Sequence, residues 1–128
     1  MATQLNVATR DGVLWQTADA TPVVAVNFPT RPSKCYWVEL KVLANYSDQS
    51  AGAIYWLVAG FRTSAAGTLT QVGTTQSVIT AQEDTGGMAC TMAASSTNVA
   101  VTVTGVAATD IQWLISSDIK ETDFIELT

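Results

Sequence analysis

Hydrophobic and polar residues alternate with a period of two along most of the chain. Successive side chains of a β-strand point to opposite faces, so this alternation predicts strands where β-branched and aromatic residues are frequent. Gly, Pro, Asn, Asp and Ser separate the alternating segments, as is typical of turns. The predicted strands cover residues 12–17, 21–28, 35–45, 52–63, 68–80, 88–94, 98–104 and 111–119, and residues 3–8 form a further strand or an arm. No segment has an apolar stripe at helical spacing.

This series of short strands and turns predicts an all-β fold without a substantial helix. We expect a single antiparallel β-sandwich or a jelly-roll-like barrel of about eight strands. A length of 128 residues suits one domain over residues 1–128, with 1–11 as an N-terminal arm and 122–128 as a C-terminal tail. A chain of this length needs neither a metal ion nor a disulfide to fold.

The segment 97–121 has the strongest strand pattern. Two alternating runs flank the short loop 105–110, which contains Gly105, and this arrangement predicts a hairpin. One face of the predicted hairpin is almost entirely Val, Ile and Trp, and we expect it to lie on the core. Its members are Val99, Val101, Val103, Ile111, Trp113 and Ile115.

Several large apolar residues fall on strand faces opposite the predicted core. Segment 52–63 is apolar on both faces, which is typical of a central strand or of a strand that contacts another chain. We interpret the outward residues either as an interface with other chains or as a second core layer under another sheet of this chain. Sugar stacking on the tryptophans is a weaker alternative, because their predicted neighbours are aliphatic. The candidate interface residues are Trp37, Leu43, Ile54, Trp56, Val58 and Leu114.

Composition narrows the class of partner. Charged residues make up only 13% of the chain, against a usual share of about 25%, which indicates that part of the surface is covered by partners. The net charge is −5 and the six Lys and Arg residues are scattered, so we expect no nucleic-acid binding and no attraction to an anionic membrane. The N-terminus lacks the pattern of a signal peptide, and no apolar run of about 18 residues predicts a membrane span.

Candidate chemistry is sparse. The chain contains no histidine, which removes the commonest general base and metal ligand, and we predict no catalytic, metal or cofactor site. Adjacent acids in the loop 82–87 are expected to be a mobile, solvated tip. The acidic candidates are Glu83, Asp84, Asp118, Glu121, Asp123 and Glu126. Cys35 and Cys90 are expected to be free, buried thiols, and whether they pair stays open.

Segments 36–78 and 97–121 resemble a small all-β module found in virion proteins of tailed bacteriophages. The resemblance is carried by the aromatic-x-aliphatic-x-small-x-Phe pattern from Tyr55 to Phe61, by GTLTQVG at 67–73, and by TNVxVxVTG followed by I-x-W at 97–113. Trp56 departs from the pattern, because it stands where an exposed face would carry a polar residue. This departure favours a contact at that face.

The resemblance implies a virion structural protein without enzymatic activity that assembles as a homotrimer. Because the module makes up almost all of this sequence, we expect an outer capsid cement or decoration protein. It would be made in the host cytoplasm and bridge capsomers by binding the major capsid protein. The alternative is a tail-fibre or baseplate module that binds a host surface glycan.

Overall fold

The alternating segments form nine β-strands in the computed structural model, which describes residues 12–122. The predicted arm, including the strand at 3–8, and most of the predicted tail lie outside the described residues. The strands are β1 (Val13–Thr17), β2 (Val23–Pro29), β3 (Cys35–Tyr46), β4 (Gly52–Thr63), β5 (Leu69–Ser77), β6 (Gln82–Glu83), β7 (Ala89–Ser95), β8 (Asn98–Thr104) and β9 (Ile111–Glu121). No described residue is helical.

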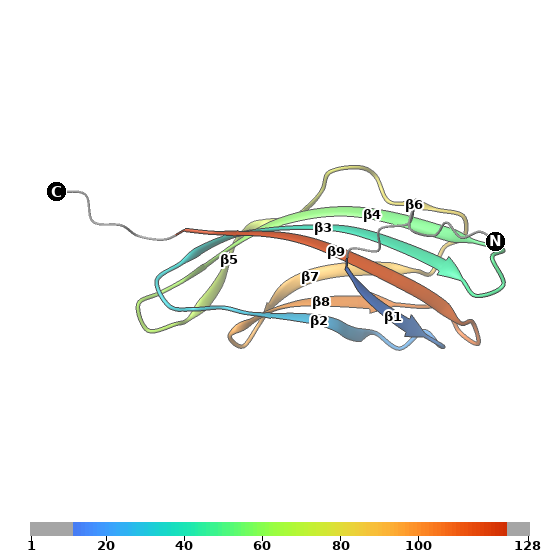
Figure 1. Cartoon of the computed structure of the whole chain (residues 1–128), viewed down its shortest axis with the longest axis horizontal. Helices are drawn as coiled ribbons and strands as arrows, with labels where there is room; N and C mark the ends of the chain where they lie inside the picture. The colour runs from blue at the N-terminus through green and yellow to red at the C-terminus, as the bar shows by residue number, and fades with distance from the viewer. Residues whose placement is uncertain (1–11, 123–128) are drawn as a thin grey trace, which may run out of the picture.

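These strands form two antiparallel sheets packed face to face (Figure 1). The larger sheet has the order β1-β9-β3-β4-β5, with the short β6 paired to β4 beside β5, and the smaller has the order β2-β8-β7. The predicted all-β, antiparallel sandwich is therefore confirmed. Pro22 directly precedes β2, an edge strand, where the absence of a proline N–H does not interrupt a ladder.

The predicted hairpin at 97–121 is wrong in its pairing. β8 lies in the smaller sheet between β2 and β7, whereas β9 lies in the larger sheet between β1 and β3. Both strands turn their apolar faces to the same core, so alternation alone cannot distinguish paired strands from strands in opposite sheets. The loop between them crosses the sandwich, and Gly105 packs so closely that an added Cβ would lie 2.5 Å from Thr17 Oγ1.

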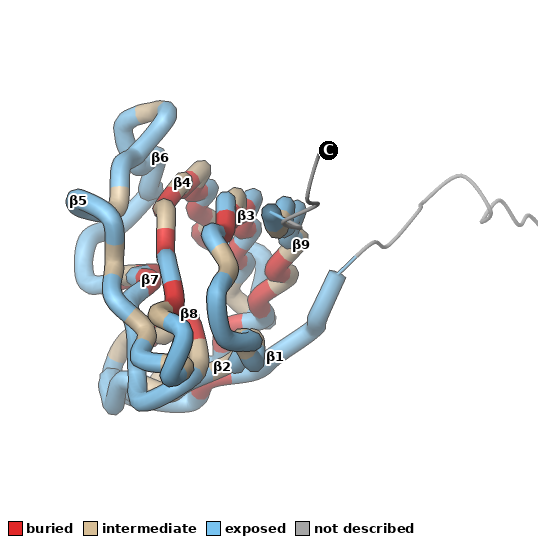
Figure 2. The backbone as a smooth tube through the Cα atoms, turned by 90° about the vertical axis from the view of Figure 1, so that its left-hand side faces the viewer, coloured by how far each residue is buried: buried red, intermediate tan, exposed pale blue. Residues whose placement is uncertain are grey.

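The core lies between the sheets, and the buried residues, red in Figure 2, lie along strands of both sheets. The predicted inward residues of β3, β8 and β9 are all buried there, and the larger sheet adds Tyr55, Leu57, Ala59 and Phe61 from β4. Trp113 is fully buried, and its indole Nε1–H donates to Thr17 Oγ1 at 2.9 Å. This hydrogen bond satisfies the one polar group of the ring, so a tryptophan can occupy the centre of the core.

The acidic segment 82–87 is held to the sheet and is not a free tip. Glu83 lies in β6, where its carboxylate accepts a hydrogen bond from the Tyr55 hydroxyl at 2.5 Å, and Asp84 accepts one from the Gly52 amide at 2.9 Å. Burial, followed by the contact with Glu83, raises the pKa of Tyr55 well above its usual value. These carboxylates therefore anchor the end of β4.

Both cysteines are free, and they differ in exposure. Cys90 is buried as predicted, whereas Cys35 is exposed, which corrects the expectation of two buried thiols. Cys35 is exposed because it lies at the start of β3, with its side chain on the face that points away from the smaller sheet. Burial raises the pKa of the Cys90 thiol to about 12.

This difference predicts selective alkylation. At pH 8, iodoacetamide should modify Cys35 and leave Cys90 protonated and unreacted, because the thiolate is the nucleophile. Mass spectrometry of the native protein should show one added group, and the urea-unfolded protein should show two. Modification of Cys90 at a comparable rate under native conditions would contradict its burial.

Candidate functional site

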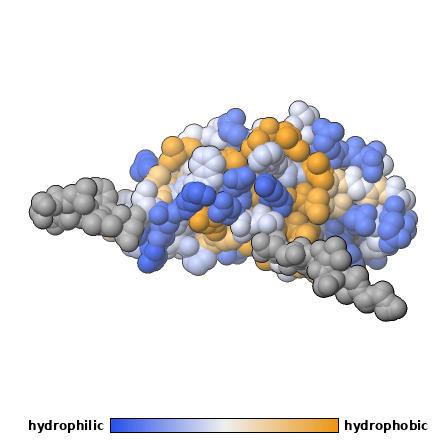
Figure 3. Space-filling view, turned by 45° about the horizontal axis from the view of Figure 1, so that its top comes forward, coloured by the Kyte–Doolittle hydropathy of each residue, from blue (hydrophilic) through white to orange (hydrophobic). Residues whose placement is uncertain are grey.

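The six predicted interface residues all lie on one surface, the outer face of the larger sheet, which points away from the smaller sheet. Trp37, Leu43 and Ile54 are exposed by 47%, 52% and 40%, whereas Trp56, Val58 and Leu114 are half-buried. No described strand covers this face, so the second core layer considered from the sequence does not exist within residues 12–122. In Figure 3 hydrophobic and hydrophilic patches alternate over the surface.

Strand register divides the outer face into two parts. The first is an aliphatic row that crosses four neighbouring strands, with Leu14 opposite Leu114, Leu114 opposite Leu43, and Leu43 opposite Ile54. Leu14, which is 53% exposed, was not among the predicted residues, although the alternation in 13–17 could have placed it on this face. Directly opposed aliphatic side chains form a continuous apolar strip.

The second part is the tryptophan cluster, which consists of Trp37, Glu39, Lys41, Trp56, Asp118 and Lys120. Glu39 lies at its centre and accepts hydrogen bonds from both indole N–H groups, at 2.7 Å from Trp56 and 3.4 Å from Trp37. The Lys41 ammonium lies 5.1 Å from the centre of the Trp56 ring, a cation–π contact. These contacts stabilise Trp56 at a position where a polar residue was expected.

The cluster places two carboxylates directly opposite each other across β3 and β9. Glu39 pairs in register with Asp118, an arrangement that is unfavourable between like charges. The indole donors compensate Glu39, and Lys120 compensates Asp118 through an ion pair of 3.0 Å. A shallow hollow of about 310 Å³ lies here, lined by Glu39, Lys41, Ser116, Ser117 and Asp118.

The neighbours of the two tryptophans differ from those predicted by alternation. The sequence predicts aliphatic neighbours, which makes sugar stacking the weaker alternative. The register places Lys120 opposite Trp37 and Lys41 opposite Trp56. Val58 lies opposite Glu39 and remains an aliphatic neighbour of the cluster, whereas Leu43, Ile54 and Leu114 belong to the separate row. Glu39 and Lys41 are not among the predicted site residues, because partners across strands cannot be read from one segment alone.

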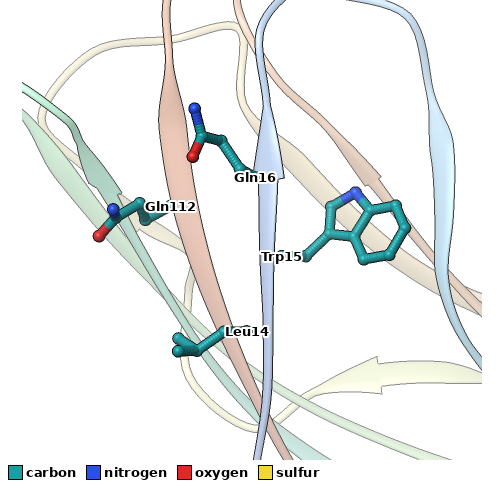
Figure 4. Close-up of a pocket in the computed structure, with 4 residues that line it drawn as sticks. All are labelled: Leu14, Trp15, Gln16 and Gln112. Atoms are coloured by element: carbon teal, nitrogen blue, oxygen red, sulfur yellow. The ribbon is translucent and has the colours of Figure 1, made fainter.

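A further hollow of about 440 Å³ lies at the β1–β9 edge and is lined by Leu14, Trp15, Gln16 and Gln112. Figure 4 shows Leu14 and Gln16 on one side of β1, toward Gln112, and Trp15 pointing to the other side. Trp15 is opposite the buried Trp113 in register and is itself 38% exposed. Uncharged amides therefore border the aliphatic row on this side.

The remaining acidic candidates do not converge. Glu121 pairs with Arg31, which holds the pKa of Glu121 below its usual value, and this pair ties the loop before β3 to the end of β9. Asp123 and Glu126 lie outside the described residues. Among residues 12–122 there is no group of three or more His, Cys, Asp or Glu residues that could hold a metal ion. The same residues include no helix long and apolar enough to cross a membrane.

No family model and no curated protein matches the chain. The chain is similar only in structure to two solved proteins. The tailspike protein of Acinetobacter baumannii phage AM24 aligns over 88% of this chain with 7% identity and a TM-score of 0.48. The tailspike protein of Acinetobacter phage vB_ApiP_P1 aligns over 95% with 19% identity and a TM-score of 0.44. The chain spans 28% and 24% of these two proteins. Similarity at this level carries no information on activity or partners.

Proposed function

We propose that this chain is a non-enzymatic structural module of a bacteriophage virion, of the tail-fibre or baseplate class, that binds a glycan of the host surface. The assignment to a virion is supported by the sequence resemblance of segments 36–78 and 97–121. The main observation in support of glycan binding is the tryptophan cluster. An exposed indole ring beside fixed carboxylates and ammonium groups suits a sugar, because a sugar has an apolar ring face and hydroxyls at its edge.

The cost of the cluster supports a binding role. The opposed carboxylates need indole and ammonium partners to be tolerated, and Trp37 is left 47% exposed, which does not stabilise the isolated chain. Local features that oppose stability tend to occur at functional sites. The absence of an enclosed cleft around Glu39 and Asp118, and the absence of histidine from the sequence, favour binding over catalysis.

The second candidate is a capsid cement protein, and the aliphatic row is the observation that favours it. An exposed apolar strip across four strands suits contact with another protein chain, either the major capsid protein or further copies of this one. Immunogold labelling of virions separates the two candidates. Label at the tail supports the proposal, and label over the head would replace it with the cement function.

The aliphatic row also suits an interface between copies of this chain, which the resemblance implies form a homotrimer. Replacing Leu43 by glutamate should dissociate the oligomer, because it places a charge between Leu114 and Ile54. Asn45→Glu is the matched control, since Asn45 is exposed on the same strand and face but lies among the bordering amides. Light scattering should give a monomer mass for Leu43→Glu and a trimer mass for Asn45→Glu. Equal masses for both variants and the original chain would exclude the row as the interface.

A further inference from the structure

Beside the tryptophan cluster, an apolar hollow of about 340 Å³ continues along the outer face. Trp37 forms the wall between the two, since it contacts Glu39 on one side and lines the hollow on the other. Gly60 lies directly opposite Trp37 in register, and Val72 lies opposite Gly60 on the next strand. The missing side chain of Gly60 therefore leaves space beside the indole ring.

The chemistry of the walls differs between the two sides of Trp37. On the hollow's side, Gly60, the 49%-exposed Val72 and the exposed Cys35 present apolar surface. On the other side, Glu39 and Asp118 supply hydrogen-bond acceptors and Lys41 supplies donors. Lys120, which pairs with Asp118, and Glu121, which pairs with Arg31, also border the apolar hollow, so each charge at its edge has a partner. The surface around the ring is thus locally neutral, with polar groups at one edge and an apolar hollow at the other.

We propose that this surface selects neutral sugars that carry an apolar substituent, such as an acetamido group or the methyl group of a 6-deoxy sugar. The inference rests on the proposed glycan binding and specifies its ligand class. The ring stacks on Trp37, its hydroxyls face the carboxylates and ammonium groups, and the substituent's methyl group enters the hollow over Gly60. Uronic acids and amino sugars are disfavoured. Their negative or positive charge would find no free partner, because the acidic and basic side chains around the ring already neutralise each other.

The test is titration of the full chain with methyl glycosides, followed by the indole N–H signals of Trp37 and Trp56 in ¹⁵N-correlated NMR spectra. The two probes of each pair differ at one substituent. N-acetylglucosamine is compared with glucose, and fucose is compared with the galactose enantiomer that has the same configuration. Burial of one methyl group is expected to lower the dissociation constant roughly fourfold in each pair.

Two variants alter the hollow and spare the polar side. Gly60→Ala fills part of it, and its added Cβ would lie 3.5 Å from Val72 Cβ, an ordinary van der Waals contact. Val72→Thr keeps the shape of the wall and makes it polar at an exposed position. Both should abolish the preference within each pair while glucose and galactose bind as before, and unchanged thermal unfolding confirms the fold.

The outcomes separate the two proposals. Equal affinity within both pairs, or a preference that survives both variants, overturns the selectivity while glycan binding stands. Tighter binding of glucuronic acid or glucosamine than of glucose also overturns it. If no sugar shifts either indole signal at high millimolar concentration, the selectivity and the proposed glycan site both fail.

Discussion

Replacing Trp113 by alanine is expected to lower the free energy of unfolding by about 3–5 kcal/mol, the range for deletion of a large buried side chain. Trp113 is fully buried, stacks on Tyr55 with ring centres 6.3 Å apart, and hydrogen-bonds Thr17. Its removal would leave a cavity between the sheets and an unused hydroxyl at the end of β1. Urea unfolding followed by circular dichroism measures the loss.

Two further variants separate packing from hydrogen bonding. Thr17→Val keeps the volume and leaves the indole N–H without its acceptor, which should cost about 1–3 kcal/mol. Trp37→Ala removes the same ring from an exposed position and should change stability by no more than about 0.5 kcal/mol. A Trp113→Ala variant that loses no more stability than Trp37→Ala would contradict the position of Trp113 in the core.

Replacing Trp37 by alanine is expected to weaken glycan binding at least about tenfold, because truncation of a central aromatic residue commonly costs 2 kcal/mol or more, as an order of magnitude. The ring supplies the stacking surface, lines the apolar hollow and hydrogen-bonds Glu39, which lines the polar one. Its loss also removes one of the two indole donors to Glu39. Isothermal titration with a polysaccharide that binds the original chain measures the effect.

Trp15→Ala is the matched control for this loss. Trp15 has a comparable exposure of 38%, but its side chain leaves β1 on the side opposite the outer face. Binding should therefore stay within about twofold of the original value, because no contact at the cluster changes. A larger loss in Trp15→Ala than in Trp37→Ala would move the binding surface to the β1 edge.

Strand positions and faces could be predicted because each depends on residues close together in the chain. The core face of β3 and the outward positions of Trp37 and Leu43 follow directly from period-two alternation. Within the segment predicted as one strand at 68–80, the structure has a register shift between β4 and β5, with Gly73 at a positive φ of 72°.

Strand pairing could not be predicted in the same way. β8 and β9 have the alternation of a hairpin, yet the six-residue loop 105–110 carries the chain from one sheet to the other. Hydrophobic alternation specifies which face is buried and leaves the neighbouring strand undetermined. The division of the outer face could not be predicted either. Leu14, Glu39 and Asp118 have their partners on neighbouring strands, and these neighbours are known only from the order β1-β9-β3-β4.

Titration of the intact protein with purified capsular and O-antigen polysaccharides from a panel of bacterial strains tests the central claim most directly. Tryptophan fluorescence, to which all four tryptophans contribute, reports binding, and the titrations of Trp37→Ala and Trp15→Ala in parallel assign the signal. We predict saturable binding to at least one polysaccharide, with the affinity lost in Trp37→Ala and retained in Trp15→Ala. Flat titrations across the panel, or binding that is unchanged in Trp37→Ala, would contradict a glycan-binding function for the outer face.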